Sequence, residues 1–554
     1  MTSQTSPSGA ADYAEYLTDF RIEDVIARLD DHADGCFNAY ESCCGKHVRA
    51  GRGNVEALVH EAMDGTVTRL TYAELDSSSA RLAGWLAQRG IGRGDRVACM
   101  LPRSPQLLIA VLASWRLGAV YQPLFTAFGS DAVEFRLARA DTKLVITDTA
   151  NRSKFDTLST CPPVLSVDGP DSTHQEDLDW SVAMASPALA TPPPRLPSDA
   201  PFLQMFTSGT VGKPKGVAVP LSALVAFHLY MELAIDLRED DCFWNMADPG
   251  WAYGLYYAIT GPLLLGVTTH FCEAGFSAEG ALAFMQRHAI TNFAAAPTAY
   301  RLMKASGIFE QAEAGLCLRV ASSAGESLNP EVVNWVAKAL GCPVMDHYGQ
   351  TETGMVCNNH HRLEHVREHG GMGVPMPGYR LVVLDAEYRE LPAGEPGVLA
   401  VDVARSPVMF FCGYTWQEKD PFVDGYYLTG DVVVGNEDGS FQFAGRDDDI
   451  ITTAGYRVGP TDVENSVLTH PAVAESAAVG QPDEIRGEII KSYVVLRDGF
   501  ESSDALAEEI RQQVRERLSS HAYPRIIEFV DALPKTPSGK IQRFKLRADA
   551  ASGA

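Results

Sequence analysis

The residues best suited to chemistry lie between Thr207 and Gly216, where hydroxyl side chains, three glycines and two lysines occur together. Glycine lets backbone N–H groups approach an anion closely, hydroxyls add donors, and lysine adds a positive charge. The apolar run Phe202–Phe206 comes just before and predicts a strand. We therefore expect a phosphate-binding loop at a strand end. Its candidate ligands are Thr207, Ser208, Gly209, Thr210, Gly212, Lys213 and Lys215.

The spacing in this loop differs from that of a Walker loop. A Walker loop has four residues between its first glycine and its Gly-Lys pair, whereas only Thr210 and Val211 separate Gly209 from Gly212 here. Pro214 follows where a Walker loop has the Ser or Thr that binds Mg²⁺. The spacing excludes a P-loop NTPase. For this loop taken alone, a solvated Gly/Lys turn remains an open alternative, so the rest of the chain must decide.

Further segments whose side chains could bind a ligand or take part in catalysis follow along the chain. Ala247–Trp251 contains an Asp-Pro-Gly turn, and Ala324–Ser327 follows a strand-like run. In the segment Tyr348–Gly354, Thr351 offers a hydroxyl to phosphate and Glu352 offers a hard oxygen to Mg²⁺. Taken singly, each segment is more often a plain turn or helix cap.

The last third of the chain adds charged candidates. Asp431 follows a tight turn, and Arg446 carries a planar multidentate donor that suits an anion. Lys540 lies in a loop rich in Pro, Ser and Gly. By itself an Arg-Asp-Asp-Asp run or a loop lysine is usually a solvated surface feature.

Together, and in this order, the segments resemble those of the adenylate-forming superfamily, which includes acyl-CoA synthetases, peptide-synthetase adenylation domains and luciferases. The similarity extends from Thr71 to Arg543, and Ala247–Trp251 resembles a segment of the acetyl- and medium-chain acyl-CoA synthetase branch. The resemblance implies an ATP-dependent ligase that converts a carboxylic acid into an acyl-adenylate and then into a CoA thioester. It implies ATP, Mg²⁺ and coenzyme A as cofactor and co-substrates.

The resemblance also implies roles by position. Lys540, Thr351 and Glu352 are the expected catalytic residues, with Glu352 holding Mg²⁺ and Lys540 joining the substrate carboxylate to the α-phosphate. Gly325, Glu326 and Ser327 are expected around adenine, and Asp431 at the ribose hydroxyls. Further expected contacts with nucleotide, phosphate or the pantetheine channel are Tyr348, Gln350, Arg446, Arg457 and Gly459.

The acid is predicted from the residues that correspond to the acyl pocket. Acetate- and propionate-specific members have a Trp just before the Gln of the Gln-Thr-Glu motif, and here that residue is Gly349. Loss of an indole predicts room for several methylenes, each contributing about 0.8 kcal/mol when buried. We expect medium-chain or branched fatty acids, with an aryl acid such as benzoate as the alternative. The expected pocket residues are Trp251, Ala252, Tyr253, Ala324 and Gly349.

Length and alternating patterns predict an α/β protein with more than one domain, because 554 residues exceed one ordinary core. We expect a large N-terminal domain of parallel-rich sheets covered by helices, residues 1–447. A small mobile α+β domain, residues 448–554, is expected after a hinge near Asp448. Thr71 and Glu74 predict a capped helix, whereas residues before about Asp19 are expected to be disordered.

The charge and cysteine content of the sequence limit the kinds of molecule that the protein is expected to bind. A formal charge of −25 opposes nucleic acid and anionic membranes. The eleven cysteines show no metal-site or disulfide-framework spacing, and the sequence contains no apolar run long enough to span a bilayer. We therefore expect a cytoplasmic enzyme with small-molecule partners. The sequence leaves the oligomeric state open.

Two other classes of protein share part of this motif set. An adenylation enzyme that loads a carrier protein would share the ATP motifs, but we would expect it to have a fused thiolation domain or an amino-acid pocket with a carboxylate for the amine. A nucleotide sensor without activity would be expected to lack Lys540 or Glu352, and both are present. The resemblance also implies that Lys540 is a target of acylation, with a lysine acyltransferase or deacylase as a partner that controls adenylation.

Overall fold

The computed structural model describes residues 11–29, 35–207, 214–311, 315–326, 328, 330–367, 370–416, 420–446, 449–453, 456–483, 486–518, 522–535 and 541–552. The chain forms two compact units. The first comprises residues 1–366, 374–379 and 404–421, and the second comprises residues 367–373, 380–403 and 422–554. The boundary expected at Asp448 lies outside the described residues and stays a prediction.

One sheet of the first unit contains the strands that flank the predicted phosphate loop. Its order is β23 (Tyr414–Thr415), β12 (Lys215–Pro220), β11 (Pro201–Thr207), β6 (Val120–Pro123), β5 (Arg96–Met100), β7 (Thr142–Thr147), β8 (Val164–Ser166) and β9 (Leu178–Asp179). The strands from β11 to β9 run parallel, whereas β12 and β23 are antiparallel to their neighbours. The buried apolar run in β11 is typical of a central strand.

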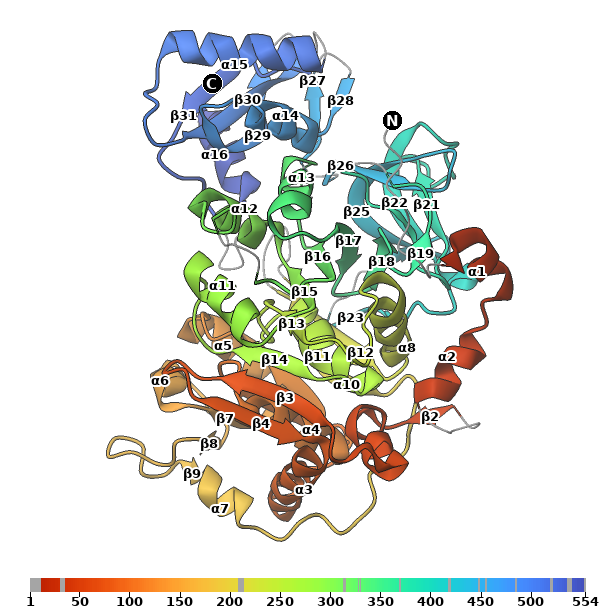
Figure 1. Ribbon diagram of the computed structural model, residues 1–554, viewed down its shortest axis with the longest axis vertical. Coiled ribbons are helices and arrows are strands. Elements are labelled where there is room, and N and C mark those ends of the chain that lie inside the picture. Colours follow the sequence, from red (N-terminus) through yellow and green to blue (C-terminus); the bar gives the residue numbers. More distant parts are fainter. Residues whose placement is uncertain are drawn as a thin grey trace. The chain divides into compact units, whose positions relative to one another are not determined.

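The second sheet of this unit contains the strands that precede the other predicted site segments. Its order is β20 (Val374–Pro375), β18 (Gly354–Asn358), β17 (Val344–Gln350), β16 (Val320–Ala324), β15 (Asn292–Ala295), β13 (Phe243–Asn245), β14 (Thr269–Cys272), β3 (Glu56–Glu61) and β4 (Val67–Thr71) (Figure 1). The strands from β17 to β3 are parallel, and the outer ones are antiparallel. The parallel strands therefore direct the chain after Ala324 and Asn245 toward one edge.

Helices cover the sheets as the alternating pattern predicts. The helix after Thr71 has the expected capping box: Glu74 N donates to Thr71 Oγ1 (3.2 Å) and Thr71 N donates to Glu74 Oε2 (2.8 Å). Helices described in this unit are α1 (Tyr13–Asp19), α2 (Ile22–Leu29), α3 (Tyr72–Gln88), α4 (Pro105–Arg116), α5 (Ser130–Ala140), α6 (Thr149–Arg152), α7 (Trp180–Met184), α8 (Ala223–Leu229), α9 (Ala252–Gly254), α10 (Gly261–Leu265), α11 (Ala278–Arg287), α12 (Pro297–Ser306) and α13 (Pro330–Ala339). The π-helices η4 (Tyr230–Ala234) and η5 (Leu255–Thr260) directly continue α8 and α9.

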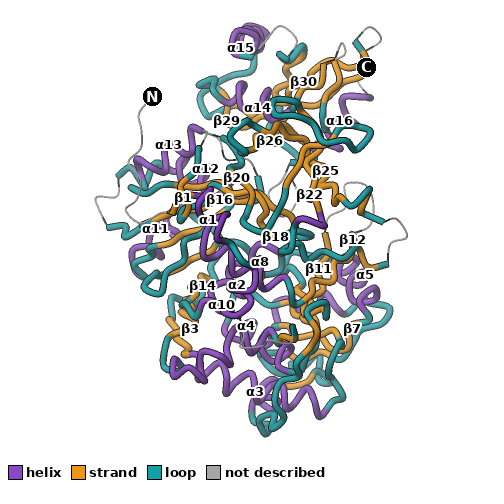
Figure 2. The backbone as a smooth tube through the Cα atoms, turned by 90° about the vertical axis from the view of Figure 1, so that its right-hand side faces the viewer, coloured by secondary structure: helices purple, strands orange, loops and turns teal. Residues whose placement is uncertain are grey.

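The expectation of disorder before Asp19 is wrong for residues 11–19. β1 (Ala11–Asp12) pairs in parallel with β19 (Leu363–Glu364), and α1 begins at once. Asp12 caps α1 by accepting from Glu15 N (3.0 Å), and Tyr13 donates its hydroxyl to Pro375 O (2.9 Å). These long-range contacts are not visible in the local composition. The next helix, α2, packs against α8 (Figure 2).

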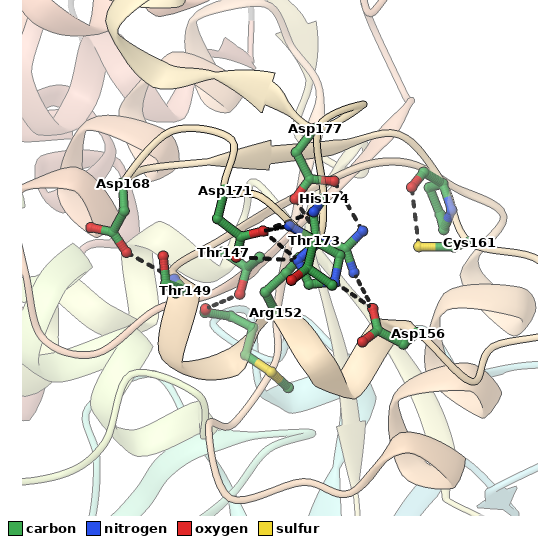
Figure 3. A network of polar contacts seen from close by, with 12 residues as sticks. Thr147, Thr149, Arg152, Asp156, Cys161, Asp168, Asp171, Thr173, His174 and Asp177 are labelled. Carbon is green, nitrogen blue, oxygen red and sulfur yellow. Dashed lines mark hydrogen bonds and ion pairs between the residues drawn. The ribbon is translucent and has the colours of Figure 1, made fainter.

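A polar network beside β7 and β8 stabilises another part of the first unit (Figure 3). Arg152 donates from Nε and Nη2 to Asp177 (2.6 and 2.9 Å) and from Nη1 to Asp156 (2.7 Å). His174 lies 3.0 Å from Asp156 and 3.2 Å from Asp171. The network joins the loop before β9 to α6, and it contains none of the predicted site residues.

The second unit contains two smaller sheets. One has antiparallel strands β21 (Leu381–Leu384), β22 (Pro396–Asp402), β25 (Tyr426–Gly435), β24 (Phe422–Val423) and β26 (Phe441–Arg446). The other has β28 (Tyr456–Val458), β27 (Ile451–Thr453), β30 (Gly487–Leu496), β29 (Val473–Asp483) and β31 (Ile526–Phe529), with helices α14 (Pro460–Leu468), α15 (Asp504–Arg517) and α16 (Arg543–Ser552). The predicted α/β class, with a large N-terminal part and a smaller C-terminal part, is confirmed. In the described ranges, every helix is too short or too polar to cross a bilayer.

Candidate active site

The predicted phosphate loop joins two paired strands. Thr207, the last residue of β11, lies opposite Lys215, the first residue of β12. The hairpin therefore presents the intervening loop at the carboxyl end of β11. The predicted ligands Ser208, Gly209, Thr210, Gly212 and Lys213 lie outside the described residues.

A chain of contacts links the lysine at the base of this loop to Glu352. The Nζ atom of Lys215 lies 4.5 Å from the centroid of the Tyr414 ring, a cation–π distance. Tyr414 donates its hydroxyl to Glu352 Oε1 (2.9 Å), and Glu352 is buried. Two predicted site residues are thus brought together by a tyrosine that sequence reasoning missed. No local pattern marks Tyr414, because it reaches β12 only through long-range strand pairing.

The same edge of the sheet explains why Gly216 must be glycine. A Cβ at Gly216 would lie 2.2 Å from Thr415 Oγ1 and 2.4 Å from the Trp416 ring. Trp416 in turn stacks on Phe206, with 5.9 Å between ring centroids. The strands on both sides of the phosphate loop are therefore held by residues 414–416.

The end of β17 forms a compact turn that carries the predicted catalytic pair. Gln350 Nε2 donates to the Tyr348 hydroxyl (3.3 Å), and Gln350 N donates to Thr353 Oγ1 (3.3 Å). Tyr256 donates its hydroxyl to Thr351 O (3.1 Å). These bonds fix the backbone from which Thr351 and Glu352 project.

The predicted adenine loop begins where β16 ends. Ala324 is buried, and Gly325 has φ 104°, a conformation that favours glycine. Glu326 accepts from Arg301 Nη2 (2.5 Å) and from Thr298 Oγ1 (3.0 Å), both on α12. The Glu326 carboxylate is thus anchored to that helix, and Ser327 lies outside the described residues.

Asp346, on β17 beside Ser323, is a candidate that the sequence analysis missed. Its Oδ2 accepts from Leu328 N (3.1 Å), and the carboxyl is fully buried beside Ser323. Burial raises the pKa of this carboxyl to about 7. A buried carboxyl that can be protonated near neutral pH is able to donate or to accept a hydrogen bond.

Asp346→Asn is expected to stabilise the protein increasingly as the pH rises. In the wild type the unfolded chain releases this proton near pH 4, but the folded chain holds it up to about pH 7. Stability is therefore lost as the pH rises through this window, up to a limit of about 4 kcal/mol. Thermal unfolding between pH 5.5 and 8 should show a Tm advantage for the variant that grows up to about pH 7 and is constant above it.

The matched control for this experiment is Asp64→Asn. Asp64 is exposed, and hydrogen bonds from Thr66 lower the pKa of its carboxyl. This control should show no growing advantage over the same pH range. A constant Tm difference for Asp346→Asn would show that its carboxyl titrates normally.

The predicted acyl-pocket segment follows a turn organised by Asp248, which accepts from Gly250 N (2.8 Å). Trp251 packs its ring against Phe125 and Phe128, at centroid distances of 5.4 and 5.5 Å. The indole nitrogen of Trp251 is buried and has no hydrogen-bond partner in the described part of the chain. Residues 251–253 are half-buried, whereas residues 254–260 are fully buried.

The structure gives a different reason for the glycine at position 349 from the one that the sequence indicated. It lies at an irregularity where β17 pairs with β18. A Cβ there would lie 2.1 Å from Gly354 O and 2.6 Å from Met355 Cα. The missing side chain therefore faces backbone rather than open space. Its absence does not by itself enlarge an acyl pocket.

Gly349→Ala is expected to destabilise the protein by about 1–3 kcal/mol, because two strands must separate to admit one methyl group. Chemical unfolding measures the loss. Gly92→Ala is the control, since a Cβ at Gly92 would meet no atom within 4 Å. Equal stability of the two variants would contradict the packing reason for Gly349.

The remaining predicted residues belong to the second unit. Asp431 is buried and pairs across β25 and β26 with Arg446, whose Nη1 donates to Asp431 Oδ1 (3.3 Å). Arg457 is on β28, and Gly459 precedes α14, where a Cβ would lie 2.1 Å from Ala444 O. Lys540 and Asp448 lie outside the described residues.

Comparisons with known proteins agree with these motifs. The profile "AMP-binding enzyme" matches residues 46–410, and "AMP-binding enzyme C-terminal domain" matches residues 462–540. The acetyl-coenzyme A synthetase of Bacillus subtilis (strain 168) is 35% identical over 97% of this chain and 94% of its own length. The crystal structure of Brucella canis acyl-CoA synthetase is 49% identical, with a TM-score of 0.79 over 98% of this chain and 99% of that one.

A benzoate CoA ligase from Burkholderia xenovorans LB400 is 28% identical, with a TM-score of 0.81 over 92% of this chain and all of that one. Profiles, relatives and structures thus confirm the predicted superfamily and reaction type. The chain belongs to the AMP-binding enzyme family and is an AMP-forming acyl-CoA synthetase, which uses ATP to join a carboxylic acid to CoA.

Proposed function

We propose that this ligase activates medium-chain or branched fatty acids. The observation that carries this proposal is the half-buried segment Trp251–Tyr253, with small side chains at Ala252 and at the predicted pocket residue Ala324. Apolar area removed from water on binding favours longer acids, at about 0.8 kcal/mol for each buried methylene. Gly349 no longer supports the proposal, because its missing side chain faces backbone.

An aryl acid is the second candidate, and a specific observation favours it. Trp251 is packed edge-on against Phe128 and lies against Phe125, so aromatic rings surround the start of the proposed acyl segment. Offset and edge-to-face ring contacts favour a planar aromatic ligand. The similar Burkholderia enzyme is a benzoate CoA ligase.

The first half-reaction requires neutralised charge and alignment. An oxygen of the substrate carboxylate attacks the α-phosphorus of ATP, the bond to pyrophosphate breaks, and acyl-adenylate forms. We assign the phosphate to the backbone and side chains of residues 207–216, the ribose to Asp431 and Arg446, and the carboxylate to Lys540. Catalysis then rests on positioning and electrostatic stabilisation.

The donor set at Glu352 fits Mg²⁺. Its carboxylate is buried and held by Tyr414, and Mg²⁺ typically takes one or two carboxylates together with substrate phosphate oxygens. When bound, the ion would neutralise phosphate charge. We assign Glu352 as its protein ligand and Thr351 as a hydroxyl donor to phosphate.

In the second half-reaction the sulfur of CoA attacks the acyl carbonyl, and AMP leaves. We propose that residues 448–554 rotate about Asp448 between the two steps, withdrawing Lys540 and bringing Arg457 and Gly459 to the thiol. A hinge motion of this kind lets one active site serve two geometries. The thiol proton passes to solvent in this scheme.

Lys540 also provides a point of control. Acylation of its amine by a lysine acyltransferase would remove the positive charge required for adenylation, and a deacylase would restore it. We propose that this modification stops the first half-reaction selectively in the cytoplasm.

The experiment that tests the acid class is a panel of carboxylic acids from acetate to decanoate, with isobutyrate and benzoate. Pyrophosphate and AMP release are measured with ATP and Mg²⁺, each with and without CoA. Turnover that peaks between butyrate and octanoate supports the fatty-acid proposal. A peak at benzoate supports the aryl alternative, whereas faster turnover of acetate contradicts both. Release that does not depend on CoA would indicate a different acyl acceptor.

A further inference from the structure

A cluster of tyrosines lies immediately behind the proposed acyl segment. Tyr230, Tyr256 and Tyr257 are at most 1% exposed, whereas Tyr253 is only half-buried. Tyr230 begins the π-helix η4, and Tyr256 and Tyr257 lie in the π-helix η5. π-Helical segments are rare in proteins as a whole, and those that occur are often found at functional sites.

Hydrogen bonds connect Tyr253 to the interior in a single line. The hydroxyls of Tyr253 and Tyr230 are 2.9 Å apart. The Tyr230 hydroxyl is 2.8 Å from His347 Nδ1, and His347 Nε2 is 3.2 Å from Asn359 O. The line ends at a backbone carbonyl, which accepts hydrogen bonds and never donates them.

The carbonyl fixes the direction of every bond in the line. Because Asn359 O only accepts, His347 must carry its proton on Nε2. Burial holds the pKa of His347 well below its ordinary value, so the ring is neutral and Nδ1 is an acceptor. Tyr230 therefore donates to His347 Nδ1. Since a hydroxyl has one proton, the bond between the tyrosines must be donated by Tyr253.

This direction determines what Tyr253 can offer to a ligand. Its only hydroxyl proton is used inward, so the oxygen retains acceptor lone pairs alone. Tyr253 is also the member of the tyrosine line that keeps accessible surface. Among the described residues, its hydroxyl makes no other hydrogen bond than the one to Tyr230.

We propose that Tyr253 is a specificity-determining acceptor and that the enzyme prefers acids carrying a hydroxyl or amino donor where the chain or ring reaches this residue. This inference rests on the proposed function, which places the acid beside residues 251–253. A donor on the acid gains a hydrogen bond to Tyr253. An ether or carbonyl oxygen of the acid at the same point faces only the lone pairs of the Tyr253 hydroxyl oxygen, so it gains no hydrogen bond.

The test compares acids that differ in one group. The aliphatic set is 5-hydroxypentanoate, hexanoate and 5-methoxypentanoate, and the aryl set is the ring positional isomers of hydroxy-, methyl- and methoxybenzoate. The measured quantity is kcat/KM for pyrophosphate release. In the wild type we expect the best hydroxy acid to exceed its methyl counterpart by about tenfold, the value of one net hydrogen bond. The methoxy acid should not exceed the methyl acid.

Two variants then separate donor from acceptor. Tyr253→Phe should abolish the hydroxy-to-methyl preference, whatever its absolute activity. Tyr230→Phe removes the inward acceptor and frees the Tyr253 proton, so the methoxy-to-methyl ratio should rise about tenfold. Tyr257→Phe is the matched control, because the Tyr257 hydroxyl accepts from Met355 N (3.2 Å) and lies outside the line. It should leave both ratios unchanged.

A merely structural role for the line predicts a different result. In that case Tyr253→Phe and Tyr230→Phe would lower activity equally on all three acids and leave both ratios as in the wild type, which would overturn the inference. A wild type that turns over methyl acids without any hydroxy preference would also overturn it while leaving the fatty-acid ligase in place. No pyrophosphate release with any acid would overturn both this inference and the proposed function.

Discussion

Glu352→Gln is expected to lower pyrophosphate release by about 10³-fold at physiological Mg²⁺. The variant keeps the size of the side chain and an oxygen that accepts from Tyr414, but it removes the buried negative charge assigned to the cation. Metal stabilisation of developing phosphate charge contributes several kcal/mol, and each 1.4 kcal/mol corresponds to about tenfold in rate. The half-maximal Mg²⁺ concentration should also rise.

This prediction needs a check that the fold is intact. Thermal unfolding of Glu352→Gln should be within a few degrees of the wild type, and calorimetric titration should show weakened binding of Mg²⁺·ATP. Glu279→Gln, an exposed carboxylate in the first turn of α11, is the control and should change neither quantity. Normal Mg²⁺ dependence in Glu352→Gln would exclude Glu352 as the ligand.

Lys540→Ala is expected to separate the two half-reactions. Adenylate formation should fall by about 10²–10³-fold, because the side chain supplies a preorganised positive charge where negative charges meet. Thioester formation from supplied acyl-adenylate should stay within about threefold, since this step does not use Lys540 in the proposed mechanism. Acylation of Lys540 should reproduce the same separation.

Lys535→Ala is the matched control in the same terminal segment. Lys535 pairs with Glu475 at 2.6 Å within the second unit, and its loss should leave both half-reactions near the wild-type rate. If Lys540→Ala lowers both half-reactions to the same extent, Lys540 has a role in folding or in both steps. The selective mechanism of control would then be wrong.

The features predicted best from the sequence were those that depend only on residues close together along the chain. The capping box at Thr71 depends on residues three positions apart, and the strand before the phosphate loop depends on a continuous apolar run. The motif order was sufficient to identify the superfamily, since a reaction that needs phosphate, ribose and metal contacts needs several loops at once. These predictions rest on local chemistry, and they were confirmed by the fold and the comparisons.

The features missed depend on contacts between distant segments. Tyr414 reaches Glu352 and Lys215 only because β23 pairs with β12, and the raised pKa of Asp346 depends on burial. Gly349 was interpreted as a lost side chain, whereas strand geometry gives the reason: the β18 backbone occupies the position of its Cβ. Residue identity tells what a side chain can do, but the direction in which it points comes from tertiary packing.

The position of β23 has a consequence for synthesis of the chain on the ribosome. Tyr414 and Thr415 complete the edge of the sheet beside β12. In the order of translation, β21 and β22 of the other unit come after β12 and before β23. Until residue 415 has emerged, β12 presents an unpaired edge, and such edges are templates for aggregation. A nascent chain that stalls shortly before Tyr414 should therefore depend on chaperones, whereas one released past residue 421 can close its first unit.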